Sequence, residues 1–207
     1  MRIFIAILIL INSLNSFTKA DDVRDFEIEG IGISLSLLDF FTKDQIEKEK
    51  NSEFTFVYKN NKFMKIGMGE GEGFYLQKNI SIYDDIGIII KPNDHDYIVY
   101  GVQGRIFCDE GINYCLSKQE EIILDLKKIF SSKSSIDKYE DKHSADKTGK
   151  SIVYINDFIF KHTEDIIGVT VTDWSEEMTS KKKWYDNLKV DIFSSEYVNF
   201  LRNEAFN

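Results

Sequence analysis

Two apolar runs joined by a short polar turn make up residues 151–174, SIVYINDFIFKHTEDIIGVTVTDW. Both runs are rich in β-branched and aromatic residues, which are typical of β-strands. The connection between them is too short to cross over a sheet, so we expect them to pair as an antiparallel hairpin. A third run of the same kind, LKVDIF, follows at residues 188–193. Together the three runs predict a sheet.

The first half of the chain repeats this pattern. Asn60 and Asn61 lie between two strand-like runs and predict the turn of a hairpin. The cluster KPNDHD at residues 91–96 predicts another turn between two further runs. The strand-like runs of this half lie at residues 26–33, 53–59, 62–68, 86–90 and 97–107.

Two segments near the ends of the chain predict helices. Residues 34–50 contain a capping-box pattern between Thr42 and Gln45, which favours two short helices with a kink. Residues 195–205 have apolar side chains at helical spacing and predict a single helix.

The clearest helix signal runs from Lys118 to about Phe130. Ser117 and Glu120 form a capping-box pattern at its start. Apolar residues at helical spacing in this segment are Ile122, Ile123, Leu126, Ile129 and Phe130. With the strands, this predicts an α+β fold, a mainly antiparallel sheet of hairpins with about three helices packed on it.

The N-terminus has the pattern of a secretory signal peptide. A basic start precedes nine consecutive apolar residues (3–11), and a polar stretch then ends at Ala20. Thr18 and Ala20 suit positions −3 and −1 of a cleavage site. We expect residues 1–20 to be removed by cleavage between Ala20 and Asp21. The alternative is a retained membrane anchor, but a spanning helix needs about 20 apolar residues.

The charge of the chain argues against two classes of partner. The chain has 35 acidic and 26 basic residues, a formal charge of −9. Removal of Arg2 and Lys19 with the signal peptide would lower this charge to −11. Proteins that bind nucleic acids or anionic membranes concentrate Lys and Arg instead. We therefore expect no nucleic-acid partner, and no stable membrane anchor after cleavage.

The two cysteines predict a structural disulfide. Cys108 and Cys115 are seven residues apart in FCDEGINYC, with Gly111 available for a turn between them. Oxidising compartments outside the cytosol favour such pairs. The alternative is a redox pair, but redox pairs favour a two-residue gap.

Residues 131–150 are polar and predict a mobile surface loop within a single mature α+β domain, residues 21–207. The stretch SADKTGKS at 144–151 ends like a phosphate-binding loop. Ser144 stands where that motif requires glycine, however, and a strand-like run follows where the motif requires a helix. As a calcium loop the same stretch has Ile155 in place of the required Glu. We expect neither site.

The sequence contains few patterns typical of catalytic or metal-binding sites. Asp94, His95 and Asp96 are metal-ligand types, but Asn and Asp in turns commonly bond their own backbone. The sequence has neither a Gly-x-Ser-x-Gly elbow nor a His-Glu-x-x-His helix. We therefore expect no catalytic residues, no cofactor and no metal site. The aromatic side chains that could line a groove are Trp174, Trp184 and Tyr185.

Four stretches resemble a family of small exported proteins from marine alphaproteobacteria with low-GC genomes. They are ADDVRDFEIEGIGISLSLLDFF (20–41), DYIVYGVQGRIF (96–107), the spacing C..K..EI..DL...F from Cys115, and the tail TDWSEE (172–177) with WYDNLKVDIFSSEYVNFL (184–201). The family is uncharacterised. The resemblance extends over nearly all of residues 21–207, and it implies an exported compartment and a similar length but no activity.

Two functional classes remain. Without a catalytic signature, the hairpin-rich sheet favours a non-enzymatic periplasmic domain that binds a small ligand or an envelope protein through a sheet face or edge. The alternative is a hydrolase-like enzyme whose carboxylates come together only in the fold. Clustered acids with shifted pKa values would favour the enzyme, and a flat apolar patch would favour the binding protein.

Overall fold

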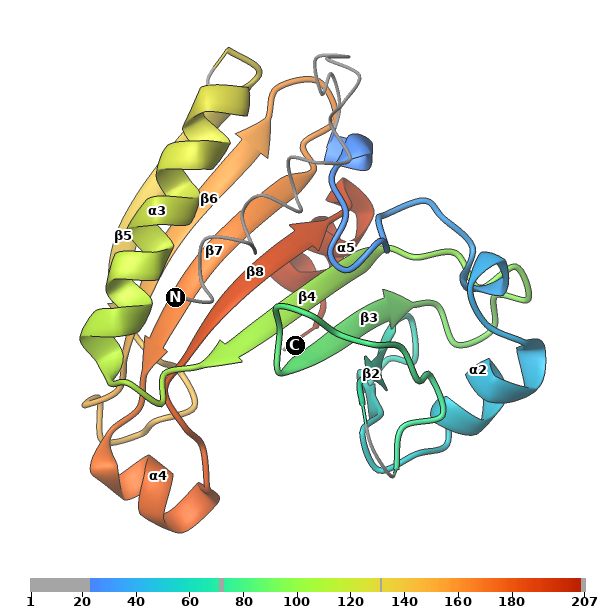
Figure 1. Cartoon of the computed structure of the whole chain (residues 1–207), viewed down its shortest axis with the longest axis horizontal. Helices are drawn as coiled ribbons and strands as arrows, with labels where there is room; N and C mark the ends of the chain where they lie inside the picture. The colour runs from blue at the N-terminus through green and yellow to red at the C-terminus, as the bar shows by residue number, and fades with distance from the viewer. Residues whose placement is uncertain (1–22, 71–72, 131, 206–207) are drawn as a thin grey trace.

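The computed structural model describes residues 23–70, 73–130 and 132–205 (Figure 1). These residues form one eight-stranded antiparallel sheet with four α-helices and two short 3-10 helices. The predicted α+β class is confirmed, with four helices rather than about three. The predicted signal peptide, residues 1–20, and the cleavage site between Ala20 and Asp21 lie outside the described residues.

The strands are β1 (Phe56–Val57), β2 (Met64–Met68), β3 (Asp85–Ile90), β4 (Gly101–Phe107), β5 (Ser134–Lys142), β6 (Ile152–Phe160), β7 (Ile166–Asp173) and β8 (Asn187–Phe193). The helices are η1 (Val23–Asp25), η2 (Leu37–Asp39), α2 (Lys43–Glu49), α3 (Ile112–Phe130), α4 (Glu176–Lys182) and α5 (Ser195–Asn203).

The last strand, β8, lies in the middle of the sheet. The strand order is β1-β2-β3-β4-β8-β7-β6-β5. Two meanders, β1–β4 and β5–β7, are therefore joined only through β8, which pairs with β4 on one side and with β7 on the other. Its central residue Val190 lies between Gly104 and Val169 in register.

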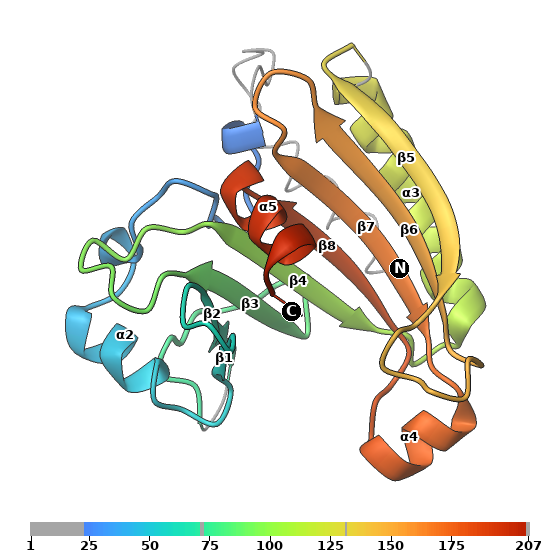
Figure 2. The ribbon, with the colours of Figure 1, turned by 180° about the vertical axis from the view of Figure 1, so that it is seen from behind.

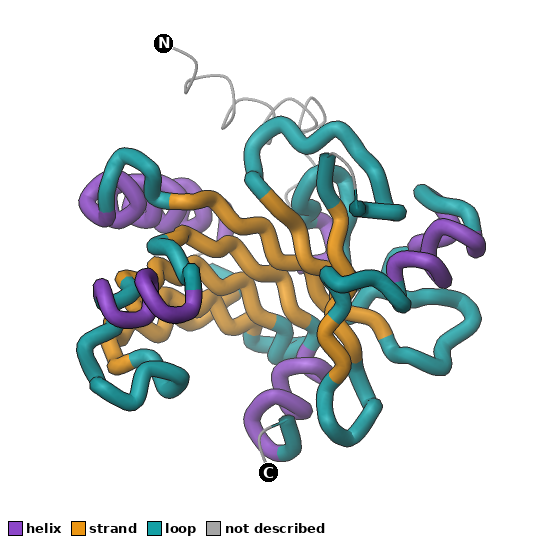
Figure 3. Tube along the Cα trace, turned by 90° about the horizontal axis from the view of Figure 1, so that it is seen from below, coloured by secondary structure: helices purple, strands orange, loops and turns teal. Residues whose placement is uncertain are grey.

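The two faces of the sheet are covered differently. We call the face that packs against α3 and the N-terminal segment the inner face, and the opposite one the outer face. Figure 3 shows α3 and α5 on opposite sides of the sheet. On the inner face of β8, Leu188, Val190 and Ile192 join the main core. On the outer face, α5 contributes Tyr197 and Phe200 to a second, smaller core that includes Ile89 of β3 and, at its border, Phe193 of β8.

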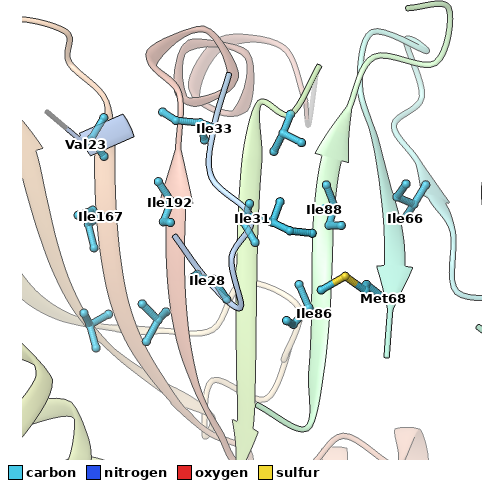
Figure 4. Close-up of a cluster of buried hydrophobic side chains, with 14 of the residues drawn as sticks. Val23, Ile28, Ile31, Ile33, Ile66, Met68, Ile86, Ile88, Ile167 and Ile192 are labelled. Atoms are coloured by element: carbon cyan, nitrogen blue, oxygen red, sulfur yellow. The ribbon is translucent and has the colours of Figure 1, made fainter. Parts of the chain in front are cut away.

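The prediction of a strand at residues 26–33 is wrong. The segment turns sharply instead, because Glu29 and Gly30 have φ angles of 50° and 76°, and Ile28 bridges to Ile31. A strand needs a continuous extended backbone, which such a turn interrupts. Figure 4 shows that its apolar residues Ile28, Ile31 and Ile33 lie against the strands of the inner face, together with Val23 of η1.

The expected loop at residues 131–150 contains a nine-residue strand. β5 pairs with β6 from Ser134 opposite Phe160 to Lys142 opposite Ile152. Most of its side chains are exposed, since it lies at the edge of the sheet. Edge strands commonly carry charged residues, which gives them the composition of a loop.

Two helix boundaries also differ from expectation. α3 begins at Ile112, so Ser117 lies inside the helix and the predicted cap with Glu120 is wrong. Between Trp174 and Trp184 the chain forms α4, a helix not predicted from the sequence, and Ser175 caps it by accepting from the Met178 N–H. The capping box of Thr42 and Gln45 is confirmed at the start of α2.

The predicted disulfide is confirmed. Cys108 follows β4 and is bonded to Cys115 in the first turn of α3, with their Cα atoms 5.7 Å apart. The bridge ties the helix of the inner face to a central strand. None of the helices within the described ranges is long and apolar enough to span a bilayer.

Candidate functional site

A row of polar residues and glycines crosses the outer face. Each member lies opposite the next in neighbouring strands, and one register therefore runs from β2 to β5. The row consists of Gly67, Gly87, Gln103, Asp191, Gly168, Asp157 and Asp137. We call it the polar row. Side chains alternate between the faces of a strand, so these all point away from the main core.

Gly168 keeps two carboxylates of this row close together. A side chain at position 168 would place its Cβ 3.2 Å from Asp157 Oδ1 and 3.5 Å from Asp191 Oδ2. The two oxygens therefore flank one small space above β7. A larger residue at this position would fill that space and separate the carboxylates.

Gly87 has the same effect on Lys65. A Cβ at position 87 would lie 2.8 Å from Lys65 Cδ, so the aliphatic part of Lys65 runs across β3 at this glycine. The ammonium of Lys65 is thereby directed from β2 towards Asp191 and Asp85. Burial lowers its pKa, and the charges of Lys189 and Arg105 lower it further.

Two carboxylates of the polar row, Asp157 and Asp191, have raised pKa values. Burial raises the pKa of Asp157 to about 6, and the neighbouring Asp191 contributes to the same shift. Burial also raises the pKa of Asp191, which is only 7% exposed. The charge of Lys189 and a hydrogen bond from Gln103 oppose this second shift. That bond runs from Gln103 Nε2 to Asp191 Oδ1 over 2.7 Å and fixes the carboxylate in place.

Several charged side chains around Asp191 are left unpaired. Asp157, Lys65 and Lys189 make no hydrogen bond or ion pair with any other residue that the structure describes. Arg105, in contrast, is bonded to Asp85 across the neighbouring strands. Partly buried charges without partners lower the stability of a fold, so their presence together points to a role other than stability.

Part of the outer face is open above this cluster. α5 lies over β4 and β8, and no helix among the described residues lies over β5, β6 and β7 on this side (Figure 2). Ile155 and Asp157 of β6 and Thr170 of β7 are accordingly part-exposed. Two hollows among the described residues, of about 150 and 270 Å³, lie elsewhere, beside Cys108 and beside Pro92.

Three aromatic rings meet at the far end of the same face. The ring centroids of Trp174 and Trp184 are 4.7 Å apart, and those of His143 and Trp174 are 4.1 Å apart. We call these three residues the aromatic ledge. Burial and the charge of Lys189 lower the pKa of His143, which favours its neutral form. Tyr185, the third aromatic residue considered for a groove, packs on Phe107, with their ring centroids 6.4 Å apart.

The residues considered as metal ligands serve a turn. Asp94 Oδ1 accepts from the backbone N–H of Asp96 at 2.9 Å, and Asp94 Oδ2 accepts from that of Ile98 at 3.0 Å. Both carboxylate oxygens are thus used to hold the chain before β4. Nowhere in residues 23–70, 73–130 and 132–205 do three His, Cys, Asp or Glu side chains gather closely enough to hold a metal ion.

The stretch that resembles a phosphate-binding loop is held by a carboxylate. Asp146 Oδ2 accepts from the Ser151 hydroxyl at 2.6 Å and from the Ser175 hydroxyl at 2.9 Å. The Ser151 bond is the largest cause of a pKa well below the ordinary carboxyl range, and Thr148 adds to it. An anionic group at the centre of the loop disfavours phosphate there.

Sequence reasoning missed Asp157, Asp191 and Lys189. A signal was present, because LKVDIF alternates apolar residues with Lys189 and Asp191. In a sheet, the polar set of such a strand must point away from the core. What the sequence does not contain is the register that places Asp157 and Asp191 on either side of Gly168.

No protein-family model matches this chain, and neither a curated protein nor a solved structure is significantly similar to it.

Proposed function

We propose that this protein is an exported, extracytoplasmic domain that binds a small polar ligand on the outer face of its sheet, over the polar row. One observation carries the proposal: Lys65, Lys189 and Asp157 surround the buried Asp191 without pairing among themselves. Ligand groups that bonded to them would supply the missing partners, and this gain would contribute to affinity.

Binding is favoured over catalysis because the cluster lies on an open sheet face. Catalytic carboxylates gain most where water is excluded and charges act at low dielectric. Here only Asp191 is deeply buried, and Asp157 is part-exposed. Asp191 is also held rigidly by Gln103, which suits a fixed hydrogen-bond acceptor for a ligand.

The extracytoplasmic location rests on the signal-peptide pattern and on the likeness to exported alphaproteobacterial proteins. The disulfide between Cys108 and Cys115 supports it, since such bonds persist in oxidising compartments. N-terminal sequencing of the protein from a periplasmic fraction should begin at Asp21. An intact Met1 in a membrane fraction would contradict the proposed location.

A screen of small metabolites by thermal shift and calorimetry tests the binding site. A ligand found in this way should lose at least tenfold in affinity with Lys189→Met, because the ammonium of Lys189 is one of the unpaired groups. Lys138→Met is a matched control, since Lys138 belongs to β5 of the same sheet but pairs in register with inner-face Asn156. Equal losses in both variants, or none in either, would place the ligand elsewhere.

A second candidate function is hydrolysis by the Asp157–Asp191 pair. A carboxyl group with a pKa of about 6 can act as a general acid near neutral pH, with a second carboxylate close by as base or nucleophile. A panel of aryl glycosides and aryl esters tests this. Turnover that disappears in both Asp157→Asn and Asp191→Asn would establish the enzyme, and turnover that survives both would exclude the pair.

A further inference from the structure

We infer that the ligand is a carbohydrate chain, which lies along the outer face from the polar row to the aromatic ledge. This inference rests on the proposed function, because it names the ligand class of the same face. It adds a second contact region, the aromatic ledge, which the proposed function does not require.

The polar row and the aromatic ledge lie on one face. On β7 every second residue from Gly168 points outward, through Thr170 and Thr172, and the same alternation reaches Trp174 just beyond the strand. At about 3.4 Å per residue, the path from position 168 to position 174 is about 20 Å long. Such a length suits an extended chain of several sugar rings rather than a single small molecule.

Donors and acceptors for hydroxyl groups lie between the two ends. Lys189 and Thr170 face each other across β8 and β7, in the register directly below the polar row. Asn187 and Thr172 form the next pair, but they are only 5% and 1% exposed and lie beneath this surface. Asn187 Oδ1 is buried and has no hydrogen-bond partner within the described residues. A sugar hydroxyl both donates and accepts, so it fits the part-exposed groups of this face, which are the Lys189 ammonium, the Thr170 hydroxyl and the Asp157 carboxylate.

The aromatic ledge supplies an apolar contact region. Trp184 is 38% exposed, and its ring centroid lies 4.7 Å from that of Trp174, with the two ring planes tilted by 51°. Sugar rings carry C–H groups on one face, and flat aromatic rings with a polar edge offer those groups a large apolar contact. The lowered pKa of His143 keeps the third ring neutral near pH 7, so the ledge does not repel a cation or select an anion.

Other extended ligands fit this face less well. A peptide gains most from free backbone groups at a sheet edge, but the path follows β7 and β8, which are paired on both sides. A nucleic acid would need clustered cations, whereas the face mixes Lys65 and Lys189 with Asp157 and Asp191. A ligand of low charge and many hydroxyl groups matches this mixture best.

Tryptophan fluorescence provides a direct test, because both tryptophans of the chain belong to the ledge. The purified protein, residues 21–207, is titrated with hexasaccharides of β-1,4-linked glucose, β-1,4-linked N-acetylglucosamine and α-1,4-linked glucose. At least one should shift the emission and saturate. Trp184→Ala should weaken that binding at least tenfold, and Trp184→Phe should restore most of it.

Two controls separate this inference from the proposed function. Tyr75→Ala removes an aromatic side chain that is 47% exposed but lies outside the outer-face path, and it should leave sugar binding unchanged. If none of the three sugars binds in calorimetry, the carbohydrate inference is wrong. If a metabolite then binds and is lost with Lys189→Met but not with Trp184→Ala, the proposed function still holds. If neither screen yields a ligand, both are wrong.

Discussion

Strands β6, β7 and β8 have two faces that differ in almost every physical respect. On the inner face, Phe158, Val169 and Ile192 are completely buried in the main core. On the outer face, the residues next to them in the sequence are Asp157, Gly168 and Asp191. A shift of one residue along each strand therefore separates an apolar core from an unpaired charge cluster.

The inner face also contains a polar side chain that is hydrogen-bonded. Gln119 of α3 is buried there, and its Nε2 donates to the carbonyls of Tyr154 and Val169 at 2.7 and 2.8 Å. Asp157 on the outer face, by contrast, has no such partner within the described chain. The comparison indicates that the inner face is organised for stability, and that the outer face keeps polar groups available for a ligand.

The difference between the two faces is tested most directly by truncating one side chain on each face of β6. Phe158→Ala should lower the free energy of unfolding by about 3–5 kcal/mol, because it leaves a cavity in the main core. Ile155→Ala, on the outer face, should cost much less. Urea denaturation measures both. Similar losses would show that the two faces are buried alike.

The second-largest effect on stability should come from loss of the disulfide. Replacement of Cys108 and Cys115 by alanine should lower stability by about 2–3 kcal/mol, since the bridge closes a short loop in the unfolded chain. The bridge anchors α3 on the inner face, so ligand binding on the outer face should persist. Wild-type protein in reductant is the matched control, and equal stability with and without reductant would contradict this prediction.

The substitution Asp157→Asn should increase stability, and by a smaller amount than the losses described above. The pKa of Asp157 is about 6 in the fold and about 3.9 in an unfolded chain. The folded state thus binds the proton more tightly, and stability falls as the pH rises from about 4 to 6. The neutral Asn variant should avoid this fall and exceed the wild type by about 1–2 kcal/mol at pH 7, with no difference near pH 4.

Denaturation curves from pH 4 to 8 measure this difference. Asp141→Asn is the control, because Asp141 lies on the same face at the exposed edge strand β5. A difference of the same size for both variants would mean that net charge, not the burial of Asp157, sets the effect.

The smallest effect should come from the edge of the outer face. Tyr139→Ala in β5 should change stability by no more than about 0.5 kcal/mol, since Tyr139 is largely exposed. Amide exchange of β5 should also be faster than that of β7, which is paired on both sides. A large loss on Tyr139→Ala would reveal burial of this edge by a second molecule.

The parts of the fold that the sequence predicts well are those with strong local signals. β-branched runs at β3, β6, β7 and β8 lie within one or two residues of expectation. The disulfide followed from the spacing of Cys108 and Cys115. In each case the structure is determined by residues close together in the sequence, or by the alternation of apolar and polar residues along a strand.

The other parts of the fold depend on contacts between residues that are far apart in the sequence. β5 has the composition of a loop and becomes a strand because β6 offers it a free edge. Asp157 and Asp191 meet only because β8 enters the sheet beside β7 in one particular register. The outer-face cluster is therefore a property of tertiary pairing, and a reading of each strand alone could not place it.

The central position of β8 has a consequence for the order of assembly during synthesis. A nascent chain that ends before residue 187 can form only two separate hairpin sheets, with β4 and β7 as unprotected edges and two apolar inner faces. Such edges pair readily with those of other chains. The newly made chain therefore needs protection from self-association until its last strand emerges, and insertion of β8 then unites both halves in one cooperative step.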